Sequence, residues 1–230
     1  MKVSRSVVLL LILAIVTSAF ASPQARSSVS LERVLNELDT QAREFRSLAA
    51  DVERTKVTVV VDDKSTESGT IEVRGDKMKL DLKVPDTRTI LKTGDQLYIF
   101  NPKLNRVEEY NLGKYKALTD QYLLLGFGTA GHELKKSYLI DVRGEPLIDG
   151  KKTVELELTP KSQAARNQIS KIDIWIDEST WLSVQQQFFE TGSDDYFIVK
   201  YSNIVKNAPI GENDFKPHWP KNVERIKPQG

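Results

Sequence analysis

The sequence contains few side chains that could carry out covalent chemistry. It has no cysteine and only two histidines, His132 and His218. Neither histidine lies near a nucleophile motif, and the sequence patterns of common hydrolases, zinc proteases and phosphate-binding loops are absent. The lack of cysteine also excludes disulfides, thiolate metal sites and cysteine nucleophiles. We therefore expect no enzymatic activity, no cofactor and no metal ion; a secreted enzyme is kept as a minor alternative.

Two pairs of acidic residues are the remaining candidates for metal binding. Asp62-Asp63 and Asp194-Asp195 both lie where turns are expected. A calcium ion would need further oxygen ligands, and the sequence does not place them near either pair. Solvated turns explain both pairs, so we predict no metal site.

The N-terminus has the layout of a cleavable export signal. Lys2 and Arg5 precede an apolar run over residues 7–16, and Ala19-Phe20-Ala21 offers small residues to signal peptidase. This predicts cleavage after Ala21 and leaves residues 22–230 as one domain in the periplasm. The alternative is a membrane anchor, but the run is about half of the roughly 20 residues that a spanning helix needs. A lipid anchor would need a cysteine.

The rest of the chain has a balanced charge and a regular alternation of apolar and polar residues. The sequence has 33 basic and 32 acidic residues, well mixed, which does not favour nucleic-acid binding. From about Ala49 apolar residues recur at every second position, as at Met78, Leu80 and Leu82 between lysines and an aspartate. Turn signals follow about every ten residues and leave no room for crossover helices. This predicts one large, curved antiparallel sheet with a single apolar face, whose strands resume at Lys136 after an interruption. The proline-rich tail, Gly211 to Gly230, is expected to lie across an end of the sheet.

Two amphipathic helices are available to cover that face. The first is predicted from Leu31 to Phe45, with Ser30 as its N-cap. The second is predicted between Lys114 and Leu125 and ends in glycines at positions 126, 128 and 131, so it could be a hinged flap or a loop with a short helix.

So little cover over so many strands predicts an apolar cavity, the kind of site that accepts acyl chains. A closed and fully packed barrel is the alternative. We expect the cavity to be lined by Met78, Leu80, Leu82, Leu97, Ile99, Leu118, Tyr122, Leu125, Val154, Leu156, Leu158, Ile172 and Ile174.

The order of these features resembles the LolA family of periplasmic outer-membrane lipoprotein carriers over essentially all of residues 22–230. The resemblance depends on five stretches in their shared order and spacing. They are the opening helix and long strand (Leu31–Val61), GTIEVRGDKMKLDLKVP (Gly69–Pro85), TGDQLYIFNPKLNRVEEYNL (Thr93–Leu112), LTPK (Leu158–Lys161) and the F-x-P-x-x-P segment with its Val-x-x-Ile ending (Phe215–Ile226).

The resemblance implies a mainly β fold with helices (α+β), an incomplete and strongly curved antiparallel β-barrel closed by a helical lid around an apolar cavity. It also implies a monomeric periplasmic carrier. Such a carrier accepts acylated lipoproteins from an inner-membrane ABC transporter, shields their acyl chains, and passes them to an outer-membrane lipoprotein receptor. The physical need is large, because exposing acyl chains to water costs about 0.8 kcal/mol per methylene.

The resemblance also assigns a role to Arg74. In the family an arginine at the end of the second strand hydrogen-bonds to the helical lid, and Arg74 matches that position when counted back from Pro85. A guanidinium suits such a latch because it can hold several helix carbonyls at once. Two departures are visible. Gly75 replaces the usual proline, and Met78 and Leu80 replace aromatic residues, which implies a different ligand selectivity.

Two further alternatives use the same fold differently. One is a regulatory domain that senses lipid or mislocalised lipoprotein and signals to a membrane partner. The other is a structural β-domain with a filled interior. The first would bind acyl chains without delivering them, and the second would not bind them.

Overall fold

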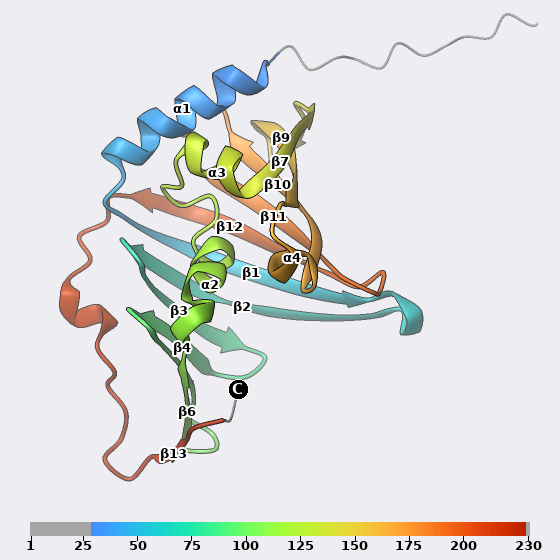
Figure 1. The fold of residues 1–230 in the computed structure, drawn as a ribbon. Helices are drawn as coiled ribbons and strands as arrows, with labels where there is room; N and C mark the ends of the chain where they lie inside the picture. The colour runs from blue at the N-terminus through green and yellow to red at the C-terminus, as the bar shows by residue number, and fades with distance from the viewer. Residues whose placement is uncertain (1–28, 229–230) are drawn as a thin grey trace, which may run out of the picture.

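The computed structural model describes residues 29–228, so the predicted signal peptide lies outside the described residues. Within this part the strands form one strongly curved sheet, in the order β13-β6-β5-β4-β3-β2-β1-β12-β11-β10-β9-β7 (Figure 1). Neighbouring strands are antiparallel except the short β13, which lies parallel to β6. The two end strands do not pair with each other, so the predicted open antiparallel barrel is confirmed and a closed barrel is wrong.

The strands are mostly joined by short turns, as the turn signals predict. Their bounds are β1 (Ser47–Thr58), β2 (Asp63–Arg74), β3 (Lys77–Val84), β4 (Arg88–Thr93), β5 (Gln96–Asn101), β6 (Arg106–Asn111), β7 (Tyr138–Gly144), β8 (Leu147–Ile148), β9 (Lys151–Pro160), β10 (Ile169–Asp177), β11 (Ser183–Glu190), β12 (Tyr196–Lys206) and β13 (Glu224–Ile226). The short β8 pairs with β9 beside the main sheet.

The helices are α1 (Leu31–Glu44), α2 (Lys116–Leu123), α3 (Gly131–Ser137) and α4 (Gln163–Arg166). In Figure 1, α1 crosses one end of the sheet, α3 lies beneath it, and α2 lies further along in the hollow of the sheet. We call the face under these helices the concave face. The hydroxyl of Ser30 caps α1 by accepting a hydrogen bond from the Arg33 amide at 3.3 Å, as predicted.

The main core fills the concave face beneath α1 and α3. Val34 and Leu38 of α1 and Leu134 of α3 are buried against strand residues of both halves of the sheet. Gly131 lets the two helices meet closely, since a Cβ there would lie 2.1 Å from the Leu35 carbonyl oxygen. Side chains of α1, α3 and the strands therefore form a packed core at this end of the sheet.

Two local predictions differ from the structure. The strand predicted to run to Val61 ends at Thr58, and Val59–Val61 form a 3-10 turn whose valine side chains are exposed. Their branched side chains favour a strand, but no second layer lies there to cover them. The strand predicted to begin at Lys136 begins at Tyr138, because α3 occupies the residues before it.

The C-terminal segment, residues 207–228, forms a second, smaller core on the convex face, which is the side of the sheet away from the helices. Leu91 of β4 and Val107 of β6 are almost fully buried there, as is Phe215 of the segment. Trp219 stacks on Phe100 of β5, with ring centroids 4.8 Å apart. In Figure 1 the segment descends past the ends of the strands to β13. The prediction that the tail lies across an end of the sheet therefore describes only part of its course.

Candidate functional site

A cavity of about 460 Å³ lies between α2 and the concave face. Its walls come from β1, β2, β3, β4, β11 and β12 and the first residue of β10, while α2 supplies one side. Most lining side chains are aliphatic or aromatic, and the volume falls in the range of about 300–1,000 Å³ that is usual for small-ligand sites. They are Val52, Arg54, Ile71, Met78, Leu80, Leu82, Ile90, Leu118, Thr119, Tyr122, Leu123, Gln168, Ile169, Gln186, Phe188, Phe197, Val199 and Tyr201.

Five of the predicted lining residues lie on this wall. They are Met78, Leu80 and Leu82 of β3, with Leu118 and Tyr122 of α2. The three strand residues share the concave face because of their two-residue spacing. The two α2 residues face the cavity because they lie one helical turn apart.

The other predicted lining residues are placed differently, and this corrects the prediction. Six of them are buried in the main core: Leu125, Val154, Leu156, Leu158, Ile172 and Ile174. The five strand residues among them do face the concave side, but other core side chains, including Leu125 from the loop after α2, pack against them. Leu97 and Ile99 of β5 also share that face through their pairing with Lys92 and Ile90, yet they lie beyond the cavity. The alternation of apolar residues shows which face of the sheet a side chain occupies. The position of the covering helices decides where on that face a cavity remains.

Sequence reasoning missed the aromatic part of the wall. Phe188 of β11 and Phe197 of β12 are paired in register and stack with ring centroids 4.6 Å apart. Tyr201 lies further along the same face of β12, where its hydroxyl donates to the Gln186 side chain at 3.2 Å. Burial raises the pKa of Tyr201 above its ordinary value, so its phenol stays neutral. The two-residue spacing along each strand was the signal that could have found them. Phe188, Phe197 and Tyr201 alternate with residues that point to the convex face.

Ion pairs hold α2 over the cavity. Lys92 of β4 is fully buried, and its Nζ lies 2.7 Å from Oδ1 of Asp120 on α2. The same ammonium donates to the backbone carbonyl of Asp76, in the turn between β2 and β3. Lys116 of α2 completes the group, 2.6 Å from Asp120 and 3.3 Å from Asp76. We call these four residues the lid cluster.

The lid cluster changes the titration of two of its members. Burial opposes ionisation of Asp76, but the hydrogen bond from Lys116 and the charges of Lys92 and Lys116 lower the pKa of this carboxyl overall. The hydrogen bond to Asp120 raises the pKa of Lys116. Asp76 and Lys116 therefore stay charged over the whole physiological range.

Tyr122 provides a second connection for α2. Its hydroxyl donates to the Ala165 carbonyl of α4 at 3.0 Å. Burial raises the pKa of Tyr122 to about 12, so the phenol keeps its proton and remains a donor at neutral pH. The helix is thus attached to β4 through a charge pair and to α4 through a neutral hydrogen bond.

Arg74 does not contact the helices above the cavity, which corrects its prediction as a lid latch. Its neighbour Val73 pairs with Met78 and points to the concave face, so Arg74 points to the convex face. There its Nη1 donates to the Ile210 carbonyl at 2.7 Å, and its Nε lies 3.6 Å from the Glu212 carboxylate. In this structure Arg74 contacts the C-terminal segment, whereas Lys92 is the strand residue that pairs with α2.

The two histidines have structural contacts. Nδ1 of His132 lies 2.7 Å from Oδ1 of Asp39, and this contact joins α3 to α1. The hydrogen bonds from His132 lower the pKa of Asp39. His218 is exposed in the C-terminal segment. Within residues 29–228, no group of three or more histidine, aspartate or glutamate side chains is arranged to hold a metal ion.

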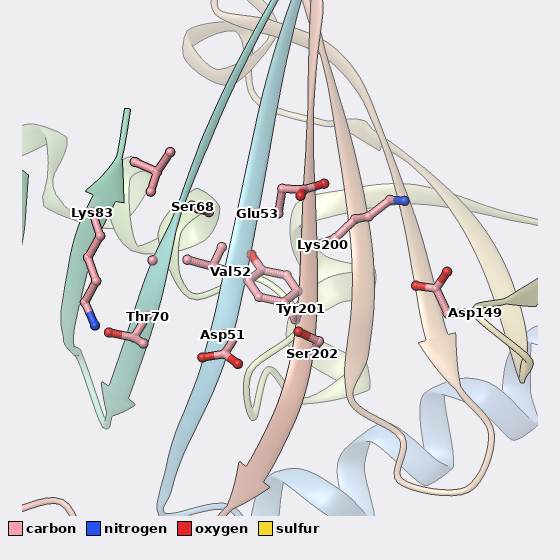
Figure 2. A pocket seen from close by; sticks show the side chains of 12 residues that line it. Asp51, Val52, Glu53, Ser68, Thr70, Lys83, Asp149, Lys200, Tyr201 and Ser202 are labelled. Carbon is pink, nitrogen blue, oxygen red and sulfur yellow. The ribbon is translucent and has the colours of Figure 1, made fainter. Parts of the chain in front are cut away.

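A second hollow, of about 590 Å³, lies over β1, β2 and β12 (Figure 2). Its walls carry carboxylates and ammonium groups, such as Asp51, Glu53, Lys83 and Lys200, with serine and threonine hydroxyls between them. Such a lining would leave an acyl chain against charged groups, which is costly. The cavity under α2 is therefore the better candidate for an apolar ligand.

The sequence of this chain matches one family, described as outer membrane lipoprotein carrier protein LolA, over residues 43–218. The chain belongs to the LolA family. The match runs from the end of α1 through β12 into the C-terminal segment, so it includes every strand that lines the cavity. No curated protein has a sequence that matches the chain significantly.

Solved structures that are similar to this LolA-family chain differ widely from it in sequence. A conserved protein of Thermus thermophilus is 9% identical, with a TM-score of 0.55 over 87% of this chain and 100% of its own. The lipoprotein LppX of Mycobacterium tuberculosis is 13% identical, with a TM-score of 0.48 over 79% of this chain and 99% of its own. A LolA superfamily protein of Nitrosomonas europaea is 14% identical, with a TM-score of 0.41 over 80% and 97%. At 9% identity, the Thermus thermophilus structure shows the fold alone.

Among the described residues, no helix has the length and apolar character needed to cross a membrane.

Proposed function

We propose that this protein is a periplasmic carrier that holds the acyl chains of lipoproteins in the cavity under α2. It would receive them from an inner-membrane ABC transporter and deliver them to a receptor at the outer membrane, without catalysing a reaction. The observation that carries the proposal is the cavity of about 460 Å³, with its mainly apolar wall and a separately attached helix above it. Membership of the LolA family supports the proposal.

The energetics of this cavity suit a carrier. Burying about ten methylenes contributes about 8 kcal/mol, which corresponds to micromolar affinity before the costs of binding are subtracted. A carrier needs affinity in this range because it must also release its cargo. The α2 helix contributes no fully buried residue, and its Tyr122 and Leu123 are only partly buried against the core.

A release assay tests the proposal. Spheroplasts that produce acylated lipoproteins would be incubated with the purified protein, and lipoprotein in the supernatant would be measured by immunoblot. We expect release that depends on this protein and saturates with its concentration. Binding without release would favour the lipid-sensing alternative, and the absence of both would refute the proposal.

The chain offers a matched pair of control variants. Leu80 and Lys79 are neighbours on β3, but Leu80 lines the cavity and Lys79 points to the convex face. We expect Leu80→Gln to reduce release at least tenfold, since it places an amide against the acyl chain. Lys79→Gln should leave release unchanged. Equal effects of both substitutions would mean that cargo does not occupy the cavity.

A further inference from the structure

One end of the cavity carries more positive than negative charge. At the end nearer the β1–β2 turn, Arg54 and Arg88 share one carboxylate, that of Glu67. The Nη1 of Arg54 lies 3.3 Å from one oxygen, and the Nη2 of Arg88 lies 2.6 Å from the other. Two guanidinium groups and one carboxylate leave one positive charge. The next pair along β1, Lys56 with Glu190 at 3.1 Å, is balanced and does not offset it.

The Arg54 side chain belongs to the cavity wall. It shares the concave face with Val52 and lies among the lining residues. Its Cζ lies 5.0 Å from the ring centroid of Phe197, so the guanidinium rests on the aromatic part of the wall. The side chain is 35% exposed, which places its charge at the boundary between the cavity and solvent.

The two arginines have unused hydrogen-bond donors. Each guanidinium carries five N–H groups. Within residues 29–228, Arg54 and Arg88 each make one side-chain hydrogen bond, and both bonds go to Glu67. The Nε of Arg88 is buried there with no acceptor. A buried donor without a partner is costly, and an anionic oxygen at this position would remove that cost.

We infer that Arg54 and Arg88 bind an anionic headgroup, a carboxylate or a phosphate, of an amphiphile whose acyl chain occupies the cavity. The planar fork of a guanidinium matches both anions and holds them with paired hydrogen bonds. This inference rests on the proposed function and adds the class of headgroup that the cavity selects. An acyl chain under α2 would extend between Phe188 and β3, with its charged end against Arg54.

Displacement of a neutral fluorescent probe, N-phenyl-1-naphthylamine, from the purified protein tests the inference. Four amphiphiles with the same acyl length would compete below their micelle concentrations. They are hexadecanoate, palmitoyl lysophosphatidylglycerol, hexadecanol and palmitoyl lysophosphatidylcholine. We expect the two anionic compounds to displace the probe at about tenfold lower concentration, equivalent to about 1.4 kcal/mol. The stronger of the two anions identifies a fatty acid or an acidic phospholipid as the source of the headgroup.

Three variants assign the preference to these residues. Arg54→Gln and Arg88→Gln should each reduce the tenfold preference for anionic amphiphiles to about twofold, while hexadecanol binds as before. Glu67→Gln should increase it, because the variant frees both guanidinium groups without removing either. Lys56→Gln, on the same face of β1, is the control and should leave the preference unchanged.

Equal displacement by anionic and neutral amphiphiles in the unmodified protein would overturn the inference while leaving the proposed function intact. An undiminished preference in both arginine variants would overturn it too. If neither the probe nor any amphiphile binds, the proposed function fails, and the headgroup site fails with it.

Discussion

Replacing Lys92 by methionine should release α2 from the sheet. Methionine has a similar length and can fill the same buried space, but it cannot pair with Asp120 or donate to the Asp76 carbonyl. The variant therefore removes the connection between β4 and the helix while keeping the packing of the concave face.

The size of the effect follows from the burial of the two partners. Lys92 is fully buried and Asp120 is 23% exposed, so their 2.7 Å contact is only weakly screened by solvent. Breaking a fully buried pair costs about 3–5 kcal/mol, and an exposed pair contributes about 0–1 kcal/mol. Asp120 keeps Lys116 as a partner, which lowers the cost. We expect about 2 kcal/mol, or roughly a thirtyfold shift toward the open lid.

Hydrogen–deuterium exchange measures this shift directly. Amides of α2 should exchange about thirtyfold faster in Lys92→Met, whereas amides of β10 should exchange at the original rate. Lys103→Met is the control, because Lys103 pairs with Asp86 on the exposed surface. Unchanged exchange of α2 would refute the assignment of Lys92 as the latch. Equal acceleration in β10 would show global destabilisation instead.

Three further predictions concern the supports of the lid and the packed end. Tyr122→Phe removes the hydrogen bond to Ala165 and should accelerate α2 exchange about fivefold, for a loss of about 1 kcal/mol, while acyl binding persists. Gly131→Ala should lower the melting temperature by several degrees, because its Cβ would meet backbone of α1, whereas Gly144→Ala has room and should be neutral. The pKa values of Asp39 and Asp76 are lowered in the folded protein, so their contribution to stability is fully present above the ordinary pKa of an aspartate and is lost as the pH falls through the lowered values. Urea denaturation should therefore show stability falling below about pH 4, and Asp39→Asn should weaken that dependence.

The sheet could be predicted from the sequence because alternation is a local property. The pattern of Met78, Leu80 and Leu82 assigns a face to β3, and the structure agrees. What it could not assign was the position of the helices over that face. Leu156 and Ile174 alternate just as clearly, yet they are buried in the core. The difference depends on long-range packing of α1 and α3, which no local pattern records.

Two missed features did leave a signal in the sequence. The two-residue spacing of Ile90 and Lys92 places both side chains on the same apolar face of β4. A lysine buried on such a face needs a partner for its charge, and this indicates an acidic residue above it. The apolar run of Leu97 to Phe100 has large side chains on both faces of one strand, which indicates cover on both sides. The C-terminal segment, with Trp219, provides the second cover.

Photo-crosslinking tests the central claim, that the space under α2 holds acyl chains, most directly. A lipopeptide with a diazirine in its acyl chain would be bound to the protein and the complex irradiated. Mass spectrometry would then map the sites at which the lipopeptide is attached. We expect adducts in β3, β4 and α2, on peptides that contain Leu80, Ile90 and Leu118, and their loss when unlabelled lipopeptide competes. Adducts confined to the convex face, around Phe100 and Trp219, would contradict the claim.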